Sequence, residues 1–198
     1  MSWMKRHGND TYYKRAQRIG APSRAYYKLA QIDHHQRLLH NGMKLLDLGS
    51  SPGGWVAYES RAVGASGHIF AVDTEQLRID VPANVTFIQA DVLQLTQTGL
   101  NPHFEGKVDA VLSDLAPKFS GIASVDSARH YELVLAAEEI ARAKLDRDGI
   151  FLVKLFRSED FQQIIAGLRS SFEKLILEKP ESSRVTSSEI YAVCKGLR

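Results

Sequence analysis

The chain has 198 residues, of which 44% are hydrophobic, with a net charge of +2 and one cysteine, Cys194. This size predicts a single domain over residues 1–198 with one good hydrophobic core. One cysteine excludes a disulfide framework and a cysteine-based metal cluster, and no stretch reaches the ~20 apolar residues that cross a bilayer. We therefore expect a protein of a reducing, cytosolic setting, without a metal and without a membrane partner, and take a monomer as the default.

Basic charge is concentrated at the beginning of the chain. Residues 1–44 contain nine Lys and Arg against two Asp, a net +7, so the rest of the chain carries −5. Tyrosines and histidines are interleaved with these bases, which suits a surface that meets phosphates and stacks on nucleic-acid bases. The alternative is a solvated basic helical face whose tyrosines belong to the core. Helices are expected at 11–20 and 23–39, and residues 1–40 form a basic helical extension.

The remainder of the chain alternates short apolar runs with amphipathic segments. The apolar runs predict strands at 43–49, 68–73, 84–91, 107–114, 149–156, 172–180 and 188–196. Helices are expected up to about Val63, from about Val125 to Leu145, and near 160–170. This alternation is typical of an α/β fold with a doubly wound, mostly parallel sheet, here of seven strands and ending in an antiparallel hairpin.

In such a sheet, ligands bind beyond the carboxyl ends of the strands. The residues at those ends are Asp47, Asp73, Asp91, Asp114 and Lys154. Each alone is more often a cap or turn residue, but five at one edge predict a ligand site. Lys154 interrupts the apolar run GIFLVKLF, where an uncompensated ammonium is costly. The alternative for this lysine is that it reaches solvent from the end of the strand.

A glycine-rich turn, DLGSSPGGW, follows the first predicted strand. Gly49, Gly53 and Gly54 would let a ligand approach the backbone closely. The spacing matches neither the dinucleotide fingerprint nor a P-loop. Asp73 follows at about the interval at which an acid holds ribose hydroxyls in this architecture. A cofactor with a ribose and an adenine but no pyrophosphate is indicated, which points to S-adenosyl-L-methionine.

Several separated motifs then point to one family. PSRAYYKL, DLGSSPGGW, QAD, VLSDLAPKFSG, LVKLF and KPESSRVTSSEIYAV follow one another between Trp3 and Gly196. In this order they resemble the FtsJ (RrmJ) family of ribose 2'-O-methyltransferases. The opening WMKRHGNDTYYKRAQRIG is similar to the members that act on large-subunit ribosomal RNA. The resemblance implies a Rossmann-like class I S-adenosylmethionine-dependent fold, contact of residues 1–40 with RNA, and a uridine of 23S rRNA in the large ribosomal subunit as the target.

The same resemblance implies the site residues. The implied catalytic set is Lys28, Asp114, Lys154 and Glu189, and the implied cofactor-binding residues are Gly53, Trp55, Asp73, Asp91 and Asp114. A ribose hydroxyl is a very weak acid, so a base must take its proton or cations must stabilise the developing alkoxide. We expect Lys154 to be the general base, because burial beside a second lysine favours its neutral form. Asp114 and Glu189 would orient and partly compensate it, which works against the neutral form, and Lys28 would position the ribose or stabilise the oxygen.

Two other functions remain open from the sequence. A methyltransferase of tRNA anticodon loops would use the same four catalytic residues and differ only in its substrate. A non-catalytic RNA-binding factor of ribosome assembly could keep the fold, although the intact catalytic set favours an enzyme.

Overall fold

The computed structural model describes residues 23–98, 105–183 and 187–198; the helix predicted at 11–20 lies outside them. Within these ranges the strands form one seven-stranded sheet in the order β3-β2-β1-β4-β5-β7-β6. The strands are β1 Lys44–Leu48, β2 His68–Asp73, β3 Val85–Gln89, β4 Val108–Ser113, β5 Leu145–Phe156, β6 Phe172–Glu178 and β7 Glu189–Leu197. Neighbouring strands are parallel from β3 to β5, and β7 is antiparallel to both β5 and β6. The predicted sheet, with its antiparallel C-terminal hairpin, is confirmed.

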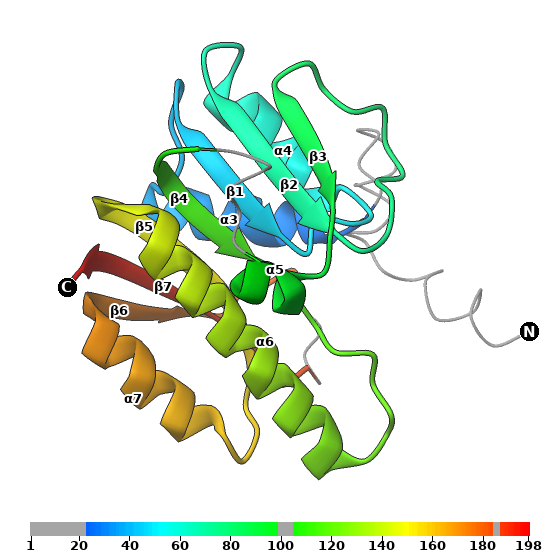
Figure 1. The fold of residues 1–198 in the computed structure, drawn as a ribbon, viewed down its shortest axis with the longest axis vertical. Helices are drawn as coiled ribbons and strands as arrows, with labels where there is room; N and C mark the ends of the chain where they lie inside the picture. Colours follow the sequence, from blue (N-terminus) through cyan, green and yellow to red (C-terminus); the bar gives the residue numbers. More distant parts are fainter. Residues whose placement is uncertain (1–22, 99–104, 184–186) are drawn as a thin grey trace, which may run out of the picture.

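Helices cover both faces of this sheet (Figure 1). The helices are α3 Ala25–Gln36, α4 Gly54–Val63, α5 Val92–Thr98, α6 Ala123–Lys144 and α7 Phe161–Ser171. Residues of α3 and α4 belong to one hydrophobic cluster, and residues of α5, α6 and α7 belong to a second cluster on the opposite face. Among the described residues, no helix is long and apolar enough to span a membrane.

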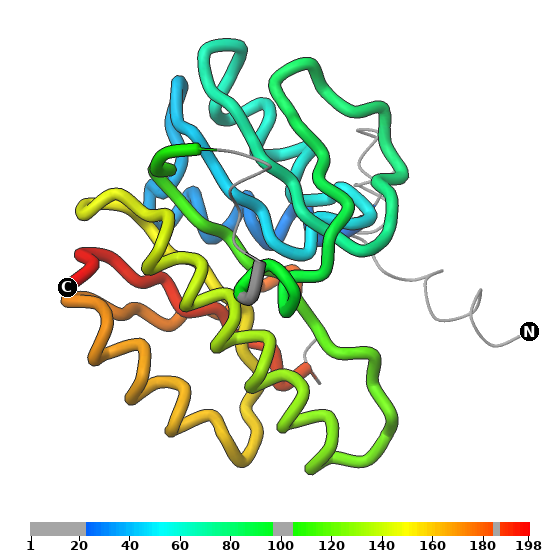
Figure 2. Tube along the Cα trace, in the orientation of Figure 1, coloured from blue at the N-terminus to red at the C-terminus, as the bar shows by residue number. Residues whose placement is uncertain are grey.

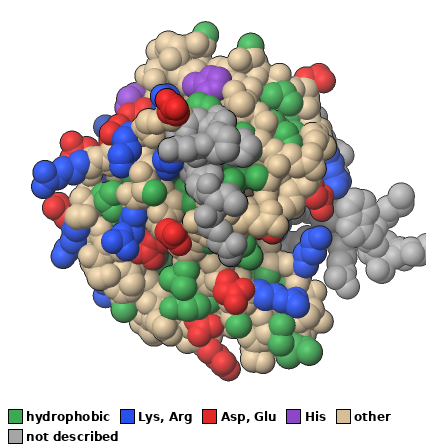
Figure 3. Space-filling view, viewed as in Figure 1, with side chains coloured by type: hydrophobic (Ala, Val, Ile, Leu, Met, Phe, Trp, Pro, Cys, Tyr) green, Lys and Arg blue, Asp and Glu red, His purple; other side chains and the backbone are tan. Residues whose placement is uncertain are grey.

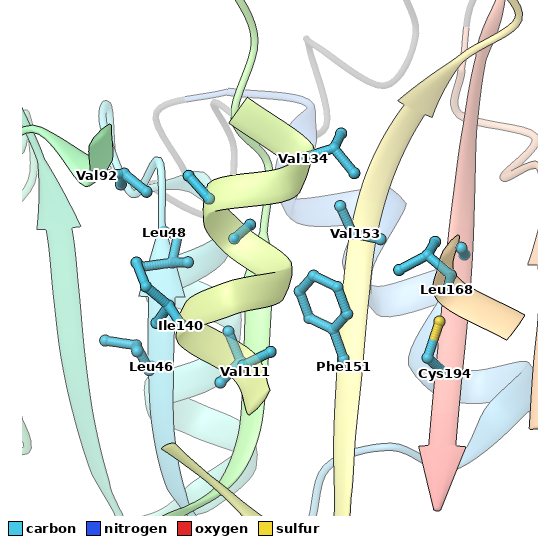
Figure 4. Packing of buried hydrophobic residues seen from close by; sticks show 14 of the residues in the cluster. Leu46, Leu48, Val92, Val111, Val134, Ile140, Phe151, Val153, Leu168 and Cys194 are labelled. Atoms are coloured by element: carbon cyan, nitrogen blue, oxygen red, sulfur yellow. The ribbon is translucent and has the colours of Figure 1, made fainter. Parts of the chain in front are cut away.

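The spacing of buried residues on α6 explains how it packs. Ser127, His130, Val134, Ala137 and Ala141 are all buried and recur every three or four residues, which places them on one helix face. Figure 4 shows Val134 close to Val153 of β5, with Phe151 further along the same strand and Leu168 of α7 beside Cys194 of β7. This packing fixes α6 against the strand that carries Lys154.

Two elements differ from the sequence prediction. The third strand is expected to run to Asp91 but ends at Gln89, and Asp91 instead accepts a hydrogen bond from the Leu93 N–H (2.9 Å) at the start of the short helix α5, which was not predicted. Strand β5 starts at Leu145 rather than at Gly149. Its pairing with β4 shifts register between Val108 and Ala110, so the polar residues 146–148 bulge outward before the buried run begins.

The strand order reverses next to β1, because the chain goes from β1 to β2 and β3 on one side and continues with β4 on the other. A crevice at the carboxyl ends of the strands is expected at such a switch point. The connection from β4 to α6 leaves this point and runs along the outside of the molecule, at the lower right of Figure 2. The glycine loop after β1 and this connection therefore face each other across the switch point.

Candidate active site

A cavity of about 420 Å³ opens at the switch point. Its lining includes Gly49 and Ser51 of the loop after β1, and the acids Asp73, Asp91 and Asp114 that follow β2, β3 and β4. Gly49 has φ +85°, and a Cβ atom there would lie 3.0 Å from the backbone nitrogen of Leu115. Only glycine fits this position without strain, which lets the loop after β1 pass directly against Leu115 just after β4.

The acids of this cavity are held in fixed orientations. Asp73 accepts hydrogen bonds from the backbone N–H groups of Ser51 (2.9 Å) and Glu75 (2.8 Å). A carboxylate offers about four acceptor positions. Asp73 therefore keeps capacity for a ligand hydroxyl, while Asp91 uses one oxygen to begin α5.

Gly53 and Trp55 lie behind the loop and do not line the cavity. Gly53 has φ +107°, and a Cβ atom there would meet the Ile79 side chain at 2.8 Å. Trp55 is 2% exposed, and its ring centroid lies 5.8 Å from that of Tyr191. Gly53 thus packs the loop against Ile79, and Trp55 packs behind the site against Tyr191. Direct contact of either residue with a cofactor stays a prediction.

A second cavity, of about 620 Å³, adjoins the first and shares Ala116 with it. Lys154 and Glu189 line this second cavity, whereas Asp114 lines the first. The Nζ atom of Lys154 lies 3.0 Å from Oδ1 of Asp114 and also donates to the Asp114 carbonyl oxygen. This ion pair is therefore the point at which the two cavities meet.

The structure brings the four predicted catalytic residues together as two ion pairs. Besides the Lys154–Asp114 pair, the Nζ atom of Lys28 on α3 lies 2.7 Å from each carboxylate oxygen of Glu189 on β7. Ser183 donates a further hydrogen bond to Glu189 (2.9 Å). Lys28, Lys154 and Glu189 are 7%, 6% and 8% exposed. Charges this deeply buried are tolerated only when they are paired and hydrogen-bonded, as they are here.

Tyr191 connects the two pairs, and sequence reasoning missed it. Its hydroxyl donates to Oδ1 of Asp114 (3.0 Å), and its ring centroid lies 6.0 Å from Nζ of Lys28. Burial, with the nearby Asp114 and Glu189 carboxylates, raises the pKa of Tyr191, so its phenol remains a donor. The signal was available: Tyr191 follows Glu189 by two positions on a strand, which puts both side chains on one face.

His130 of α6 contacts the backbone of Lys154. Its Nε2 atom lies 3.2 Å from the Lys154 carbonyl oxygen, so it must carry the hydrogen that it donates. Burial lowers the pKa of His130, which keeps the ring neutral. Within the described ranges, no group of three or more His, Cys, Asp or Glu side chains is arranged to hold a metal ion.

Two buried carboxyl groups lie beneath the glycine loop, Asp47 of β1 and Glu59 of α4. Both are fully buried, and none of their four oxygens meets a donor among the described residues. Burial raises the pKa of both, and the charges of Asp114 and Asp73 raise that of Asp47 further. The two carboxyls are close enough that the charge of Asp47 contributes to raising the pKa of Glu59. At least one of the two carboxyls is therefore held neutral.

A doubly wound sheet with a ligand cavity at its switch point and a charged cluster in an adjoining cavity defines an α/β enzyme that binds a nucleoside-type cofactor. The FtsJ-like methyltransferase family matches residues 21–197, and the chain belongs to that family. The resemblance of the sequence motifs is thereby confirmed.

Relatives and solved structures agree with this assignment. The chain is 41% identical over 200 residues to "Ribosomal RNA large subunit methyltransferase E" of Pseudomonas fluorescens, covering all of this chain and 94% of the relative. It is 40% identical to the protein of the same name in Chromohalobacter salexigens, over 98% and 93% of the two chains. A ribosomal RNA methyltransferase structure from Plasmodium falciparum has a TM-score of 0.75 and 27% identity, over 88% and 97%. Aeropyrum pernix fibrillarin, solved with S-adenosyl-L-methionine, shares the fold with a TM-score of 0.60 at 17% identity, over 86% and 75%.

Proposed function

We propose that this chain transfers the methyl group of S-adenosyl-L-methionine to a ribose 2'-hydroxyl of the large ribosomal subunit RNA, with a uridine of 23S rRNA as the target. The observation that carries the proposal is the Lys154–Asp114 ion pair, which joins the two adjoining cavities. Such an arrangement lets a cofactor in one cavity meet a ribose in the other. The names of the relatives at about 40% identity support the large ribosomal subunit as the partner.

The first cavity fits the proposed cofactor. S-adenosyl-L-methionine supplies a methyl group that is activated by the positive charge of its sulfonium. The acids Asp73, Asp91 and Asp114 in the lining accept hydrogen bonds from hydroxyl and amino groups and favour a cationic ligand. We assign these three acids to cofactor binding, with Gly53 and Trp55 keeping the loop and the wall in place.

In the second cavity, the chain itself must prepare the ribose hydroxyl. Lys154 is the proposed general base, because its Nζ atom stands at the junction between the cavities. To act so it must first release its own proton, and as the neutral amine it then takes the proton of the ribose hydroxyl. Asp114 accepts hydrogen bonds from both Lys154 and Tyr191, which fixes the lysine in position. Lys28, held by Glu189, stabilises negative charge on the attacking oxygen. Holding the hydroxyl in line with the methyl group contributes further to the rate.

The N-terminal part of the chain is assigned to RNA contact within a single domain of residues 1–198. Arg24 lines the second cavity directly before α3, and α3 carries Lys28 into the site. Residues 1–40 therefore lead to the place where the ribose is bound, and their basic composition suits phosphate contacts. The protein is expected to act as a monomer in the cytoplasm.

Methyl transfer from labelled S-adenosyl-L-methionine to large ribosomal subunits, free ribosomal RNA and bulk tRNA tests the proposal, with wild type and Lys154→Ala compared in parallel. We expect label at one alkali-resistant ribose of the large subunit, reduced roughly 10²- to 10⁴-fold in the variant. Label on tRNA alone would identify a tRNA methyltransferase. RNA binding without any methyl transfer would identify a non-catalytic assembly factor.

A further inference from the structure

An exposed phenylalanine stands at the edge of the second cavity. Phe119, in the connection between β4 and α6, is 64% exposed although it lines this cavity. Ile122, three residues later in the same connection, is 60% exposed but is not part of the cavity lining. Apolar and basic side chains adjoin each other at the lower right of the space-filling view, over the segment between β4 and α6 (Figure 3). A single exposed aromatic is ordinary on a protein surface, so the argument depends on how this one is held and what surrounds it.

The backbone around Phe119 is fixed by α6. The Asp126 carboxylate accepts hydrogen bonds from the backbone N–H groups of Ser120 (2.7 Å) and Gly121 (3.0 Å) and from the Ser120 hydroxyl (2.8 Å). Arg129, one turn further along, donates to the Lys118 carbonyl oxygen (3.3 Å). Four hydrogen bonds to α6 thus clamp the residues on both sides of Phe119. Its ring is presented to solvent by a structured segment.

Phe119 is also placed at a defined position relative to the reactive lysine. Its ring centroid lies 5.7 Å from that of Phe156 in an edge-to-face arrangement. The Nζ atom of Lys154 lies 5.9 Å from the centroid of Phe156 on the inner side. Phe156 therefore separates the lysine at the junction of the cavities from the exposed ring at the outer edge. A nucleotide bound in this cavity could therefore place its ribose next to Lys154 and its base next to the Phe119 ring.

The charge around the cavity favours a nucleic-acid occupant. Arg24 and Arg157 line it, and they suit the phosphates on either side of a bound nucleotide. The two acids in the lining are already engaged: Asp126 accepts from Ser120 and Gly121, and Glu189 is paired with Lys28. A base needs only an aromatic face to stack on, and the basic residues around it supply the attraction for the backbone.

We propose that Phe119 is the stacking surface for the base of the nucleotide whose ribose is methylated, an inference that rests on the proposed function and adds a substrate-positioning residue to it. Stacking holds a base without reading its identity. Phe119 therefore orients the target nucleotide, and sequence recognition comes from elsewhere on the ribosomal subunit.

Steady-state methyl transfer to large ribosomal subunits that lack the modification tests this role, with Phe119→Ala, Phe119→Trp, Phe119→Leu and the matched control Ile122→Ala. We expect Phe119→Ala to lower kcat/KM for the subunit about tenfold or more, with cofactor affinity by calorimetry within about twofold of wild type. Phe119→Trp should restore activity and Phe119→Leu should not, while Ile122→Ala stays within about twofold. Rescue by Leu, or equal losses at both positions, would show a general apolar contact, such as one with a subunit protein, and would overturn the proposal.

A binding measurement separates this inference from the proposed function. Tryptophan fluorescence of Phe119→Trp is titrated with a short oligouridylate, with wild type giving the background of the two native tryptophans and Ile122→Trp as the control. Quenching confined to Phe119→Trp supports base stacking even if the wild type methylates none of the RNAs, a result that would refute the proposed function alone. No quenching at this position overturns the stacking role, whatever the enzyme methylates.

Discussion

Replacing Glu59 by glutamine is expected to stabilise the protein, and to do so increasingly as the pH rises. The Asp47–Glu59 pair holds a proton in the folded protein because burial raises the pKa of both carboxyls. In the unfolded chain these groups lose their protons near pH 4. A group whose pKa is raised by folding contributes stability below its unfolded pKa, and that contribution is lost as the pH rises. For each proton held, the loss is about 1.4 kcal/mol per pH unit until the folded pair itself ionises.

Glutamine at position 59 can donate its amide N–H to Asp47 without taking up a proton. Between pH 5.5 and 7.5 the free energy of unfolding of the variant should therefore rise relative to that of wild type, by at most ~1.4 kcal/mol per pH unit and only while the wild-type pair keeps its proton. Urea denaturation at several pH values measures this difference directly. Glu139→Gln, an exposed position on α6, is the control and should change nothing. Parallel stability curves for wild type and Glu59→Gln over this pH range would refute the proton held by this pair.

Two further substitutions test the site. Tyr191→Phe removes the hydrogen bond to the Asp114 carboxylate and should lower the single-turnover rate constant of methyl transfer about tenfold or more at saturating cofactor. An unchanged rate constant would show that Tyr191 does not help to position Lys154. Gly49→Ala should weaken cofactor binding about tenfold or more by calorimetry, because its Cβ would press on Leu115. Gly121 is the control, because it has a similar positive φ but nothing within 4 Å of a Cβ atom. Equal losses of cofactor affinity in Gly49→Ala and Gly121→Ala would show that backbone strain, and not contact with Leu115, is the cause.

The strands and the edge of the sheet that carries the site could be predicted from short stretches of sequence. Short apolar runs ended by acids located the strands and the edge at which Asp73, Asp114 and Lys154 converge, because parallel strands share one carboxyl edge. The pairing of Lys28 with Glu189 could not be read in this way, since 161 positions separate them and only the completed sheet brings them together. The motifs implied that both residues are catalytic, but not which acid holds which lysine.

The local sequence pattern also did not predict which charged groups are buried or where the shortest helix lies. Glu59 lies on the same face of α4 as the buried Trp55 and Val63, but a lone acid on an apolar face does not show that its carboxyl is fully enclosed until α4 packs on the sheet. The helix α5 is seven residues long, too short for a clear period. Its one local signal is Asp91, which caps the helix and also remains a predicted cofactor-binding residue in the cavity lining.

The place of β7 in the sheet has a consequence for when the enzyme becomes competent. Among the described residues, strand β6 pairs only with β7, and β7 also supplies Glu189 and Tyr191 to the site. Until β7 has been synthesised and inserted between β5 and β6, the Lys28–Glu189 pair cannot form and Asp114 lacks the phenolic donor of Tyr191. A growing chain that has not yet inserted β7 therefore has no assembled site. Competence for the proposed methyl transfer comes with this strand, later than the cofactor cavity at the ends of the parallel strands.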